Sequence, residues 1–547
     1  MKPFRQFRDL PRHQRQLFIG LAIANGLWGA YYLSWRITRT INTDALWISI
    51  PLLVVEIYAY FGALMFMVGM GRPRTRNSVS LREMVPPLAV YPDVDIFITH
   101  YNEGRAIIEP TVRHCLTLDY PLEKCHIYVL DDGKVPEVAA MAAELGVHYI
   151  TRPTNLHFKA GNINHALLEA KTFGEFILTL DCDHIPKPYF LQRVLPYFYE
   201  LNEGQWVPNR VAFVQTPQYF YNLPAEDPFG HRASLFYGPI QKGKDGLGAA
   251  FYTGTNALLR REAVVQVALQ RLTQEVKRQG LDQALNHYAY EGGLSTTSIT
   301  EDMETAMNLH AKGWQSVYHH ETLAEGLAPE DLQSALKQRL RWAQGTIQVL
   351  VKDNPLVKPG LNWGQRLAYF QTMYSYFGGF AVVVYLLCPI IYFLTEIPPV
   401  KALNTQFVLH LVPFLVLNRL TFISSSWGIP AKELWRAEQF AVALFPIQIQ
   451  AVWSVLTGHK IKFEVTSKQR KSGIYLGLIK PQLAFIGLTV GSAVWAGIRL
   501  AVGQGSLEAE GYWVNVAWSI YNVALLWAAV RAATWQGASG DGGSLIT

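Results

Sequence analysis

The stretch EFILTLDCD, residues 175–183, joins a run of mostly apolar residues to two aspartates separated by one cysteine. Three other runs share its form: VDIFITH at 94–100, CHIYVLDD at 125–132 and VAFVQT at 211–216. Short apolar runs with β-branched residues are typical of strands buried on both faces of a sheet. Helical patterns lie between them, for example at 106–116 and 162–171. This alternation predicts an α/β domain with a largely parallel sheet.

Polar residues follow all four predicted strands. They are HYNE (100–103), DDG (131–133), DCD (181–183) and QTPQ (215–218). In open α/β sheets, ligands bind beyond the carboxyl ends of the strands. The sequence therefore predicts one binding site built from these four strand ends.

The flanks of this domain are far more apolar. Of the 547 residues, 50% are hydrophobic and 16% are charged, and the apolar residues gather before residue 70 and after residue 373. This composition is too apolar for an ordinary soluble enzyme. Long apolar runs predict about six membrane spans, two before the domain and four after it. They lie at 17–36, 45–69, 376–394, 407–423, 482–498 and 513–530.

Basic residues set the expected orientation, because Lys and Arg are enriched in cytoplasmic loops. They precede the first span and follow the second at Arg72, Arg74, Arg76 and Arg82. We therefore expect a multi-pass protein of the inner (plasma) membrane, with the central domain and both termini in the cytosol. A further apolar run, 440–456, has basic residues on both sides and is expected to lie along the cytosolic interface. The lipid bilayer is an expected partner, and nucleic acid is not.

Two aspartate pairs end predicted strands. Alternation along an extended strand sends the side chains of Asp181 and Asp183 to the same side. Such a pair can hold Mg²⁺ against a diphosphate, although a polar turn at a strand end has the same sequence. Asp131 and Asp132 are suited to hydrogen bonds with ribose or a base, although Asp-Gly is also a common turn.

The segment SITEDMETAM, residues 298–307, contains Thr300, Glu301 and Asp302 just before a helical pattern. One interpretation makes Thr300 an N-cap and places the two acids in a favourable first turn. The other makes Asp302 a general base that accepts a proton from an attacking hydroxyl.

The segment SALKQRLRWAQGTIQVLV, residues 334–351, predicts a helix. Gln338, Arg341 and Trp342 share one face of it, being spaced i, i+3 and i+4. Arg341 can neutralise a leaving diphosphate, and Trp342 offers a flat face to a sugar ring. The alternative is an interfacial helix with Arg and Trp at headgroup depth.

A basic stretch, KIKFEVTSKQRKSG at 460–473, adjoins the predicted interfacial run. Its charges could anchor anionic headgroups. The regular placement of Phe463, Val465 and Thr466 favours a more specific loop.

DDG, DCD, TED and QRLRW occur in this order between the predicted spans. Together they resemble the motifs of the processive family-2 glycosyltransferases, in particular the bacterial cellulose synthases. The resemblance extends from DVDIFITHYNE to FEVTSK and includes FKAGNINHAL (158–167), FYTGTN (251–256) and AEGLAP (324–329).

The resemblance implies a GT-A fold, a UDP-sugar donor and Mg²⁺ or Mn²⁺ as cofactor. The implied metal residues are Asp181 and Asp183, and the implied catalytic residues are Asp302, as base, with Glu301 and Thr300. The implied donor-binding residues are Tyr101, Glu103, Asp131, Asp132, Lys159, Asp181, Gln338, Arg341 and Trp342. Trp342, Thr253, Gly254 and Thr255 would bind the acceptor, and Phe463, Val465, Thr466 and Lys468 match the family's gating loop.

The implied function is polymerisation of glucose from UDP-glucose, with inversion, into a β-glucan that passes through the protein's own membrane channel. We expect β-1,4-linked cellulose. The alternatives are curdlan (β-1,3), a mixed-linkage glucan or a polymer made from UDP-GlcNAc. A lipid-glycosylating enzyme and a non-enzymatic membrane scaffold are further rivals, which the four intact motifs disfavour.

Three regions are expected. They are a membrane region (1–85), a cytosolic GT-A domain (86–345) and a channel region with interfacial helices and the gating loop (346–547). Only a short tail follows the last span, so we expect no PilZ domain for cyclic di-GMP. Expected partners are UDP-glucose and the nascent glucan, with envelope export proteins or a second copy of the chain as further candidates.

Overall fold

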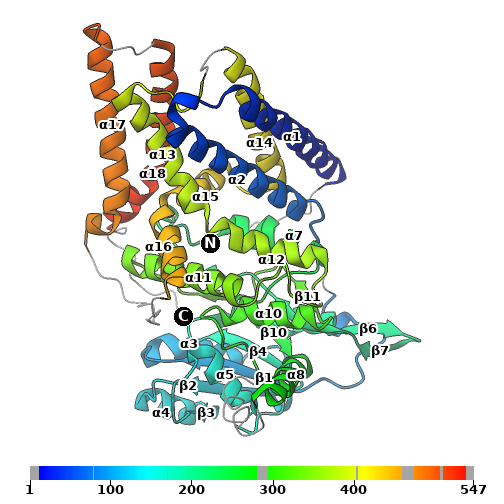
Figure 1. Cartoon of the computed structure of the whole chain (residues 1–547). Helices are drawn as coiled ribbons and strands as arrows, with labels where there is room; N and C mark the ends of the chain where they lie inside the picture. The colour runs from blue at the N-terminus through cyan, green and yellow to red at the C-terminus, as the bar shows by residue number, and fades with distance from the viewer. Residues whose placement is uncertain are drawn as a thin grey trace.

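The computed structural model describes residues 11–536, apart from 78, 169, 280–292, 402–404, 459–472 and 505–508. Figure 1 shows long apolar helices gathered at one end of the molecule and an α/β part at the other. Helices α11 (Leu332–Lys352) and α12 (Trp363–Ser375) lie between them. The chain enters the α/β part after the second long helix and leaves it before the third.

The α/β part is built on a sheet with seven strands in the described residues, in the order β11-β8-β10-β4-β1-β2-β3. The strands are β1 (Val94–His100), β2 (Cys125–Asp131), β3 (His148–Ile150), β4 (Phe176–Asp181), β8 (Val211–Gln215), β10 (Ala257–Arg260) and β11 (Gln315–Tyr318). All four predicted strands are confirmed. Strand β10 was not predicted, and it runs antiparallel to both of its neighbours, β4 and β8.

Helices cover both faces of this sheet (Figure 1). They include α3 (Arg105–Cys115), α4 (Pro136–Glu144), α5 (Phe158–Leu168), α8 (Arg261–Gln279) and α10 (Glu301–Ala311). Because neighbouring strand residues point to opposite faces, Ile96 and Ile98 enter one hydrophobic cluster while Phe97 enters the other. Burial of each such side chain contributes about 1.5–3 kcal/mol, so the continuous apolar runs stabilise the sheet from both sides.

A second, small sheet lies at the carboxyl edge of the large one. It has the order β5-β12-β9 and consists of β5 (Ile185–Pro186), β12 (Ala324–Gly326) and β9 (Tyr219–Phe220). This sheet brings the segment after DCD next to AEGLAP. A separate hairpin, β6 (Tyr199–Asn202) with β7 (Gln205–Pro208), projects from the domain in Figure 1.

In the described residues, six helices are long and apolar enough to cross a membrane. They are α1 (Arg12–Arg39), α2 (Leu46–Met70), α13 (Gly378–Thr395), α14 (Thr405–Ser425), α17 (Lys480–Ala501) and α18 (Ala509–Thr534). They coincide with the six predicted spans. The count becomes seven if the bent pair of α15 (Ala431–Ala443) and α16 (Phe445–Leu456) is one more span.

The predicted single element at 440–456 is wrong in its limits. Helices α15 and α16 meet at Leu444 with a bend of 45°. Pro446 stands in the first turn of α16, and proline cannot continue a preceding helix because it lacks an N–H and clashes with the carbonyl four residues earlier. The segment is therefore two helices, the first of which begins well before the predicted start.

Two short elements join the membrane helices to the α/β part, α7 (Gln241–Gly246) and α12 (Trp363–Ser375). A Cβ built on Gly243 would lie 2.4 Å from the carbonyl oxygen of Gly69 in α2, so only glycine permits this approach. Asp245 accepts two hydrogen bonds from Arg76, which follows α2. These contacts fix α7 against the membrane helix α2 and the segment that follows it.

Candidate active site

Strand β4 ends in an acidic cluster. Asp181, Asp183 and His184 each place a possible metal-ligand atom within 4.8 Å of the others. His184 Nδ1 is 3.1 Å from one oxygen of Asp183, and the backbone N–H of Leu327 donates to the other oxygen at 3.2 Å. The two carboxylates supply oxygen ligands of the kind that Mg²⁺ and Mn²⁺ prefer. This arrangement agrees with the predicted divalent cation at Asp181 and Asp183.

Lys159, near the start of α5, forms a short ion pair with Asp181. The two residues before it, His157 and Phe158, have φ of 58° and 48°. Residues other than glycine rarely adopt this left-handed backbone conformation, because it costs about 1–2 kcal/mol for each residue. The strained backbone turn directs Lys159 toward the carboxylates.

The predicted catalytic segment begins α10. Burial, and next the neighbouring Glu301, raise the pKa of Asp302 to about 7, against the lowering effects of the Met303 N–H and Lys159. Burial also raises the pKa of Glu301, against the charges of Lys159 and Arg341. A carboxylate with a pKa near the operating pH is well matched to general-base catalysis.

Thr300 precedes α10 but does not cap it through its side chain, so the N-cap interpretation is wrong in that respect. Within the described part of the chain, its buried hydroxyl has no hydrogen-bond partner. In the first turn, the Asp302 carboxylate accepts a hydrogen bond from the Met303 N–H at 2.7 Å.

The helix that carries Gln338, Arg341 and Trp342 is α11. Asp331 caps it by accepting a hydrogen bond from the Ser334 N–H at 2.8 Å. The Gln348 side chain of the same helix accepts from the backbone N–H of Ile299, just before the predicted catalytic segment. Burial lowers the pKa of Arg341, and the charges of Glu301, Asp181 and Asp302 counteract this. The structure therefore brings Arg341 into the field of all three carboxylates.

Hydrogen bonds hold the predicted acceptor segment, residues 253–255, beside the acidic cluster. Gln215 at the end of β8 accepts from the Thr253 N–H and donates to the Thr255 carbonyl. The Thr255 hydroxyl accepts from the Asp181 N–H at 2.9 Å. Gly254 has φ +84°, and a Cβ built on it would lie 3.4 Å from Asp302 Oδ2 and 3.8 Å from Lys159 Nζ.

The predicted nucleotide side lies beyond β1 and β2. Tyr101 is 38% exposed, and the Glu103 carboxylate accepts from the Tyr101 N–H at 3.1 Å. Asp131 is fully buried and accepts hydrogen bonds from His100 and the Tyr149 hydroxyl, besides two backbone N–H groups. Burial by itself would raise the pKa of Asp131, but these donors stabilise the carboxylate and hold its pKa below the usual value.

Asp132 forms a buried ion pair with Arg152, which the sequence did not predict. Arg152 donates to both of its oxygens at 2.7 Å, and both side chains are buried. Arg152 also donates to the carbonyls of Leu156 and Phe158, so it fixes the turn before Lys159. Asp132 therefore positions that turn in this structure.

The predicted gating loop residues Phe463, Val465, Thr466 and Lys468 lie outside the described residues.

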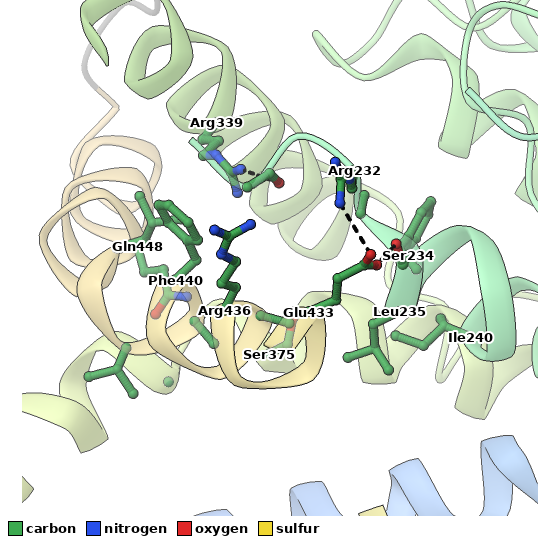
Figure 2. Close-up of a pocket in the computed structure, with 18 of the residues that line it drawn as sticks. Arg232, Ser234, Leu235, Ile240, Arg339, Ser375, Glu433, Arg436, Phe440 and Gln448 are labelled. Atoms are coloured by element: carbon green, nitrogen blue, oxygen red, sulfur yellow. Dashed lines mark hydrogen bonds and ion pairs between the residues drawn. The ribbon is translucent and has the colours of Figure 1, made fainter. Parts of the chain in front are cut away.

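A cavity of about 610 Å³ adjoins the site. Trp342 forms part of its wall, and the other walls come from residues 227–240 and from helices α13, α15 and α16. Figure 2 shows Arg436 pointing into it between Phe440 and Glu433. Glu433 pairs with Arg232 at 3.3 Å and accepts from the Ser234 hydroxyl at 2.6 Å. The cavity thus joins the tryptophan of α11 to the apolar helices.

Several of these residues were missed by sequence reasoning. His184 adjoins DCD directly, so its position beside the two aspartates was the available signal. Arg152, Glu433 and Arg436 carried no signal, because each meets its neighbours only through the tertiary fold.

Comparison with known proteins places this geometry in a family. The profile of the family described as Cellulose synthase matches residues 282–478, and that of Glycosyl transferase family 2 matches residues 95–267. The first covers the TED and QRLRW segments, and the second covers DDG and DCD.

Curated relatives match along nearly the whole chain. Cellulose synthase 1 of Komagataeibacter xylinus is 33% identical over 542 residues, which are 95% of this chain and 32% of that protein. The Cellulose synthase 1 catalytic subunit [UDP-forming] of the same organism is 32% identical over 95% of this chain and 67% of its own length. The corresponding catalytic subunit of Pseudomonas fluorescens is 29% identical, with the same coverage of both chains.

Among solved structures, a mannosyltransferase from Pyrobaculum calidifontis in complex with GDP-Man and Mn²⁺ is similar at a TM-score of 0.48 and 14% identity. That match covers 76% of this chain and all of the other. A score this low supports no conclusion about the site.

The sheet, the acidic cluster at its carboxyl edge and the family-2 profile define a glycosyltransferase of the GT-A type, combined with a bundle of apolar helices. Within that class, the chain belongs to the cellulose synthase family. It spans about a third of the length of Cellulose synthase 1 and about two thirds of the length of the catalytic subunits.

Proposed function

We propose that the protein is a processive, inverting membrane glycosyltransferase that polymerises glucose from UDP-glucose into a β-glucan, cellulose, and passes the polymer through its membrane helices. Relatives that are named UDP-forming cellulose synthases support this choice of donor. In this proposal residues 86–345 form the cytosolic transferase domain, and residues 1–85 and 346–547 form the membrane regions.

One observation carries the proposal. Trp342 lies on the same helix as Arg341, whose charge interacts with the three carboxylates. Trp342 also forms part of the wall of the cavity that reaches α13, α15 and α16. A sugar stacked on Trp342 would have the base on one side and a path toward the membrane helices on the other. An enzyme that released its product to the cytosol would not need this arrangement.

The acceptor chemistry rests on Asp302. In a single displacement with inversion, the 4-hydroxyl of the polymer's terminal glucose attacks the anomeric carbon of UDP-glucose, and the Asp302 carboxylate takes the hydroxyl proton. Gly254 leaves the space beside Asp302 open, because any side chain there would contact the carboxylate. Holding both sugars in place converts an encounter in solution into a reaction within one site.

The leaving group is UDP, whose charge grows as the bond to the sugar breaks. The guanidinium of Arg341 suits phosphate geometry and stabilises that charge, and Gln338 offers further hydrogen bonds. Mg²⁺ or Mn²⁺, held by Asp181 and Asp183, would neutralise the diphosphate when bound.

The membrane helices provide the export path in this proposal. A growing glucan is hydrophilic and cannot cross a bilayer unaided, which explains why a transferase and an apolar bundle share one chain. The cavity wall includes Trp342, Tyr376 and Phe440, aromatic rings on which sugars can stack and slide. The proposed orientation places the transferase domain in the cytosol and both termini on that side of the inner membrane.

The decisive experiment uses the full chain, purified in detergent, with labelled UDP-glucose and Mg²⁺ or Mn²⁺. The insoluble product is digested in parallel with endoglucanases specific for β-1,4, β-1,3 and mixed linkages. We expect complete digestion by the β-1,4 enzyme. Asp302→Asn should abolish synthesis while UDP binding survives, and Asp119→Asn, which changes only an exposed ion pair with Arg82, should leave synthesis intact.

Other outcomes have clear meanings. Sensitivity only to the β-1,3 or mixed-linkage enzyme would replace cellulose with curdlan or a mixed-linkage glucan. Polymer formed from UDP-GlcNAc and not from UDP-glucose would overturn the donor. UDP binding without turnover of either donor would overturn the catalytic role itself.

A further inference from the structure

We propose that Arg436 of α15 holds the growing glucan by hydrogen bonds to its hydroxyl groups, and that this contact sets how long the polymer stays bound before release. The inference rests on the proposed function, because it assumes that the cavity beside Trp342 receives the polymer. It adds a residue outside the sequence motifs, with a role in product length rather than in the chemical step.

The charged side chains on the cavity wall differ in their partners. They are Asp227, Arg232, Arg339, Glu433 and Arg436. The Asp227 carboxylate accepts from two backbone N–H groups, and Arg339 donates to two backbone carbonyls. Arg232 and Glu433 form an ion pair. In the part of the chain that the structure describes, Arg436 alone of the five forms neither a hydrogen bond nor an ion pair.

The partner expected for Arg436 within its own helix is already occupied. Glu433 lies three residues earlier, a spacing at which acidic and basic side chains pair on a helix. It pairs instead with Arg232 at 3.3 Å and accepts from the Ser234 hydroxyl at 2.6 Å. Arg531 of α18 lies within electrostatic range of Arg436 and has the same charge. A half-buried guanidinium in these surroundings has lost water without gaining a partner, so it favours a ligand that supplies acceptor groups.

The surroundings of Arg436 indicate the class of ligand. Figure 2 shows its side chain pointing into the cavity between Phe440 and Glu433. An aromatic ring such as Phe440 can stack on the face of a glucose unit, whose equatorial hydroxyls then project from the edge of the sugar ring. A guanidinium presents its N–H donors in one plane and can reach those hydroxyls from the side. The neighbouring Glu433 carboxylate disfavours a phosphate or carboxylate ligand, so an uncharged sugar fits this place best.

The position of Arg436 limits which step the contact affects. The proposed metal, base and leaving-group residues lie on or next to β4, α10 and α11, whereas Arg436 lies on α15. A contact on α15 therefore acts on polymer that has already formed. Loss of this contact favours dissociation of the chain between two additions, and the ratio of addition to dissociation determines polymer length.

The experiment uses the full chain in detergent with labelled UDP-glucose and Mg²⁺, and measures both the rate of UDP release and the length of the polymer. Arg436→Gln should shorten the polymer roughly tenfold or more, because hydrogen bonds from charged donors are among the stronger ones. The polymer length should fall far more than the rate of UDP release. The melting temperature of each variant is measured in parallel.

Two further variants separate this role from general damage. Arg436→Lys keeps the charge and several donors and should restore most of the polymer length. Lys432→Met removes an exposed cation from the same helix, away from the cavity wall, and should change neither length nor rate.

A binding measurement tests the contact without turnover. Cellohexaose is titrated into the UDP-loaded full chain by calorimetry, and Arg436→Gln should bind it roughly tenfold more weakly than the wild type. Inorganic phosphate is titrated in the same way. Phosphate binding that Arg436→Gln abolishes, together with an unchanged affinity for cellohexaose, would overturn the sugar contact and assign Arg436 to an anion.

Failure of this inference and failure of the proposed function give different results. Polymer of equal length from the wild type and Arg436→Gln would overturn the role of Arg436 alone. Equal losses of length and of UDP release would also overturn it, since they would indicate a general defect. Absence of any polymer from the wild type would overturn the proposed function and this inference together.

Discussion

Gly345 of α11 lies directly against Thr300, the residue before the proposed catalytic acids Glu301 and Asp302. A Cβ built on Gly345 would stand 2.4 Å from Thr300 Cγ2. This close approach fixes the helix that carries Arg341 and Trp342 relative to the segment that carries Glu301 and Asp302. The geometry between the proposed base and the leaving-group arginine thus depends on the absence of one methyl group.

Gly345→Ala should reduce polymer synthesis by roughly tenfold or more while the protein remains folded. The added methyl forces α11 away from Thr300, at a cost of about 1–3 kcal/mol, partly offset by the better helix propensity of alanine. Synthesis and melting temperature are measured in parallel. Gly487→Ala is the control, because a Cβ there meets nothing within 4 Å. Equal activity of the two variants would show that the contact does not position the site.

The rate of polymerisation should fall as the pH is lowered through about 7. The pKa of Asp302 is raised to about 7 by burial and by Glu301, and the base must be deprotonated to act. The initial rate is measured between pH 5.5 and 9 at saturating UDP-glucose and metal. A rate that is constant from pH 6 to 8 would contradict the assignment.

Asp302→Asn should increase stability at pH 8. A folded-state pKa above the unfolded value means that the folded protein binds more protons, so stability falls as pH rises from about 4 to about 7. Removing the buried charge should add on the order of 1 kcal/mol at pH 8 and much less at pH 4. Thermal unfolding at the two pH values tests this. A stability gain that is the same at both would refute the pKa shift.

Arg152→Met should destabilise the domain by about 3–5 kcal/mol, because it leaves the Asp132 carboxylate buried without its partner. It should also weaken binding of UDP, since the turn before Lys159 loses its support. Adding Asp132→Asn to this variant should recover part of the stability. Denaturant unfolding and UDP titration of the single and double variants give both quantities. Full additivity of the two substitutions would argue against a direct pair.

Trp342→Ala should decrease polymer formation by roughly tenfold or more, because truncation of a central tryptophan costs about 2 kcal/mol or more. Binding of UDP should change far less, since the ring is placed at the cavity and not at the nucleotide side. The control is Trp363→Ala, which removes an indole that is 82% exposed. Equal losses of UDP binding and of synthesis would assign Trp342 to the donor-binding site instead of the acceptor-binding site.

Much of the fold was predictable, because a strongly apolar run of residues can adopt few alternative structures. The residues 94–100 and 125–131 are buried on both faces, and their sequence shows it directly. The short strand β10 was missed, because four residues between polar segments carry too weak a pattern. The bend between α15 and α16 was also missed, although Pro446 was a usable signal.

The candidate site was predictable in its members but not in its pairings. Asp181, Asp183, Glu301, Asp302 and Arg341 were all expected from their motifs, and the structure brings them to one edge of the sheet. Their partners were not expected. Arg152 for Asp132 and Gln215 for the acceptor segment come from distant parts of the chain, and no local pattern indicates such pairs.

The sequence by itself determined the strands, the apolar helices and the types of chemical group at the strand ends, because periodicity and composition act over a few neighbouring residues. Only the tertiary structure decided that Lys159 pairs with Asp181, that Asp302 is buried enough for its pKa to rise, and that Trp342 opens onto a cavity among the apolar helices. Electrostatic interactions and burial depend on distances through space, and a chain acquires those distances only when it folds.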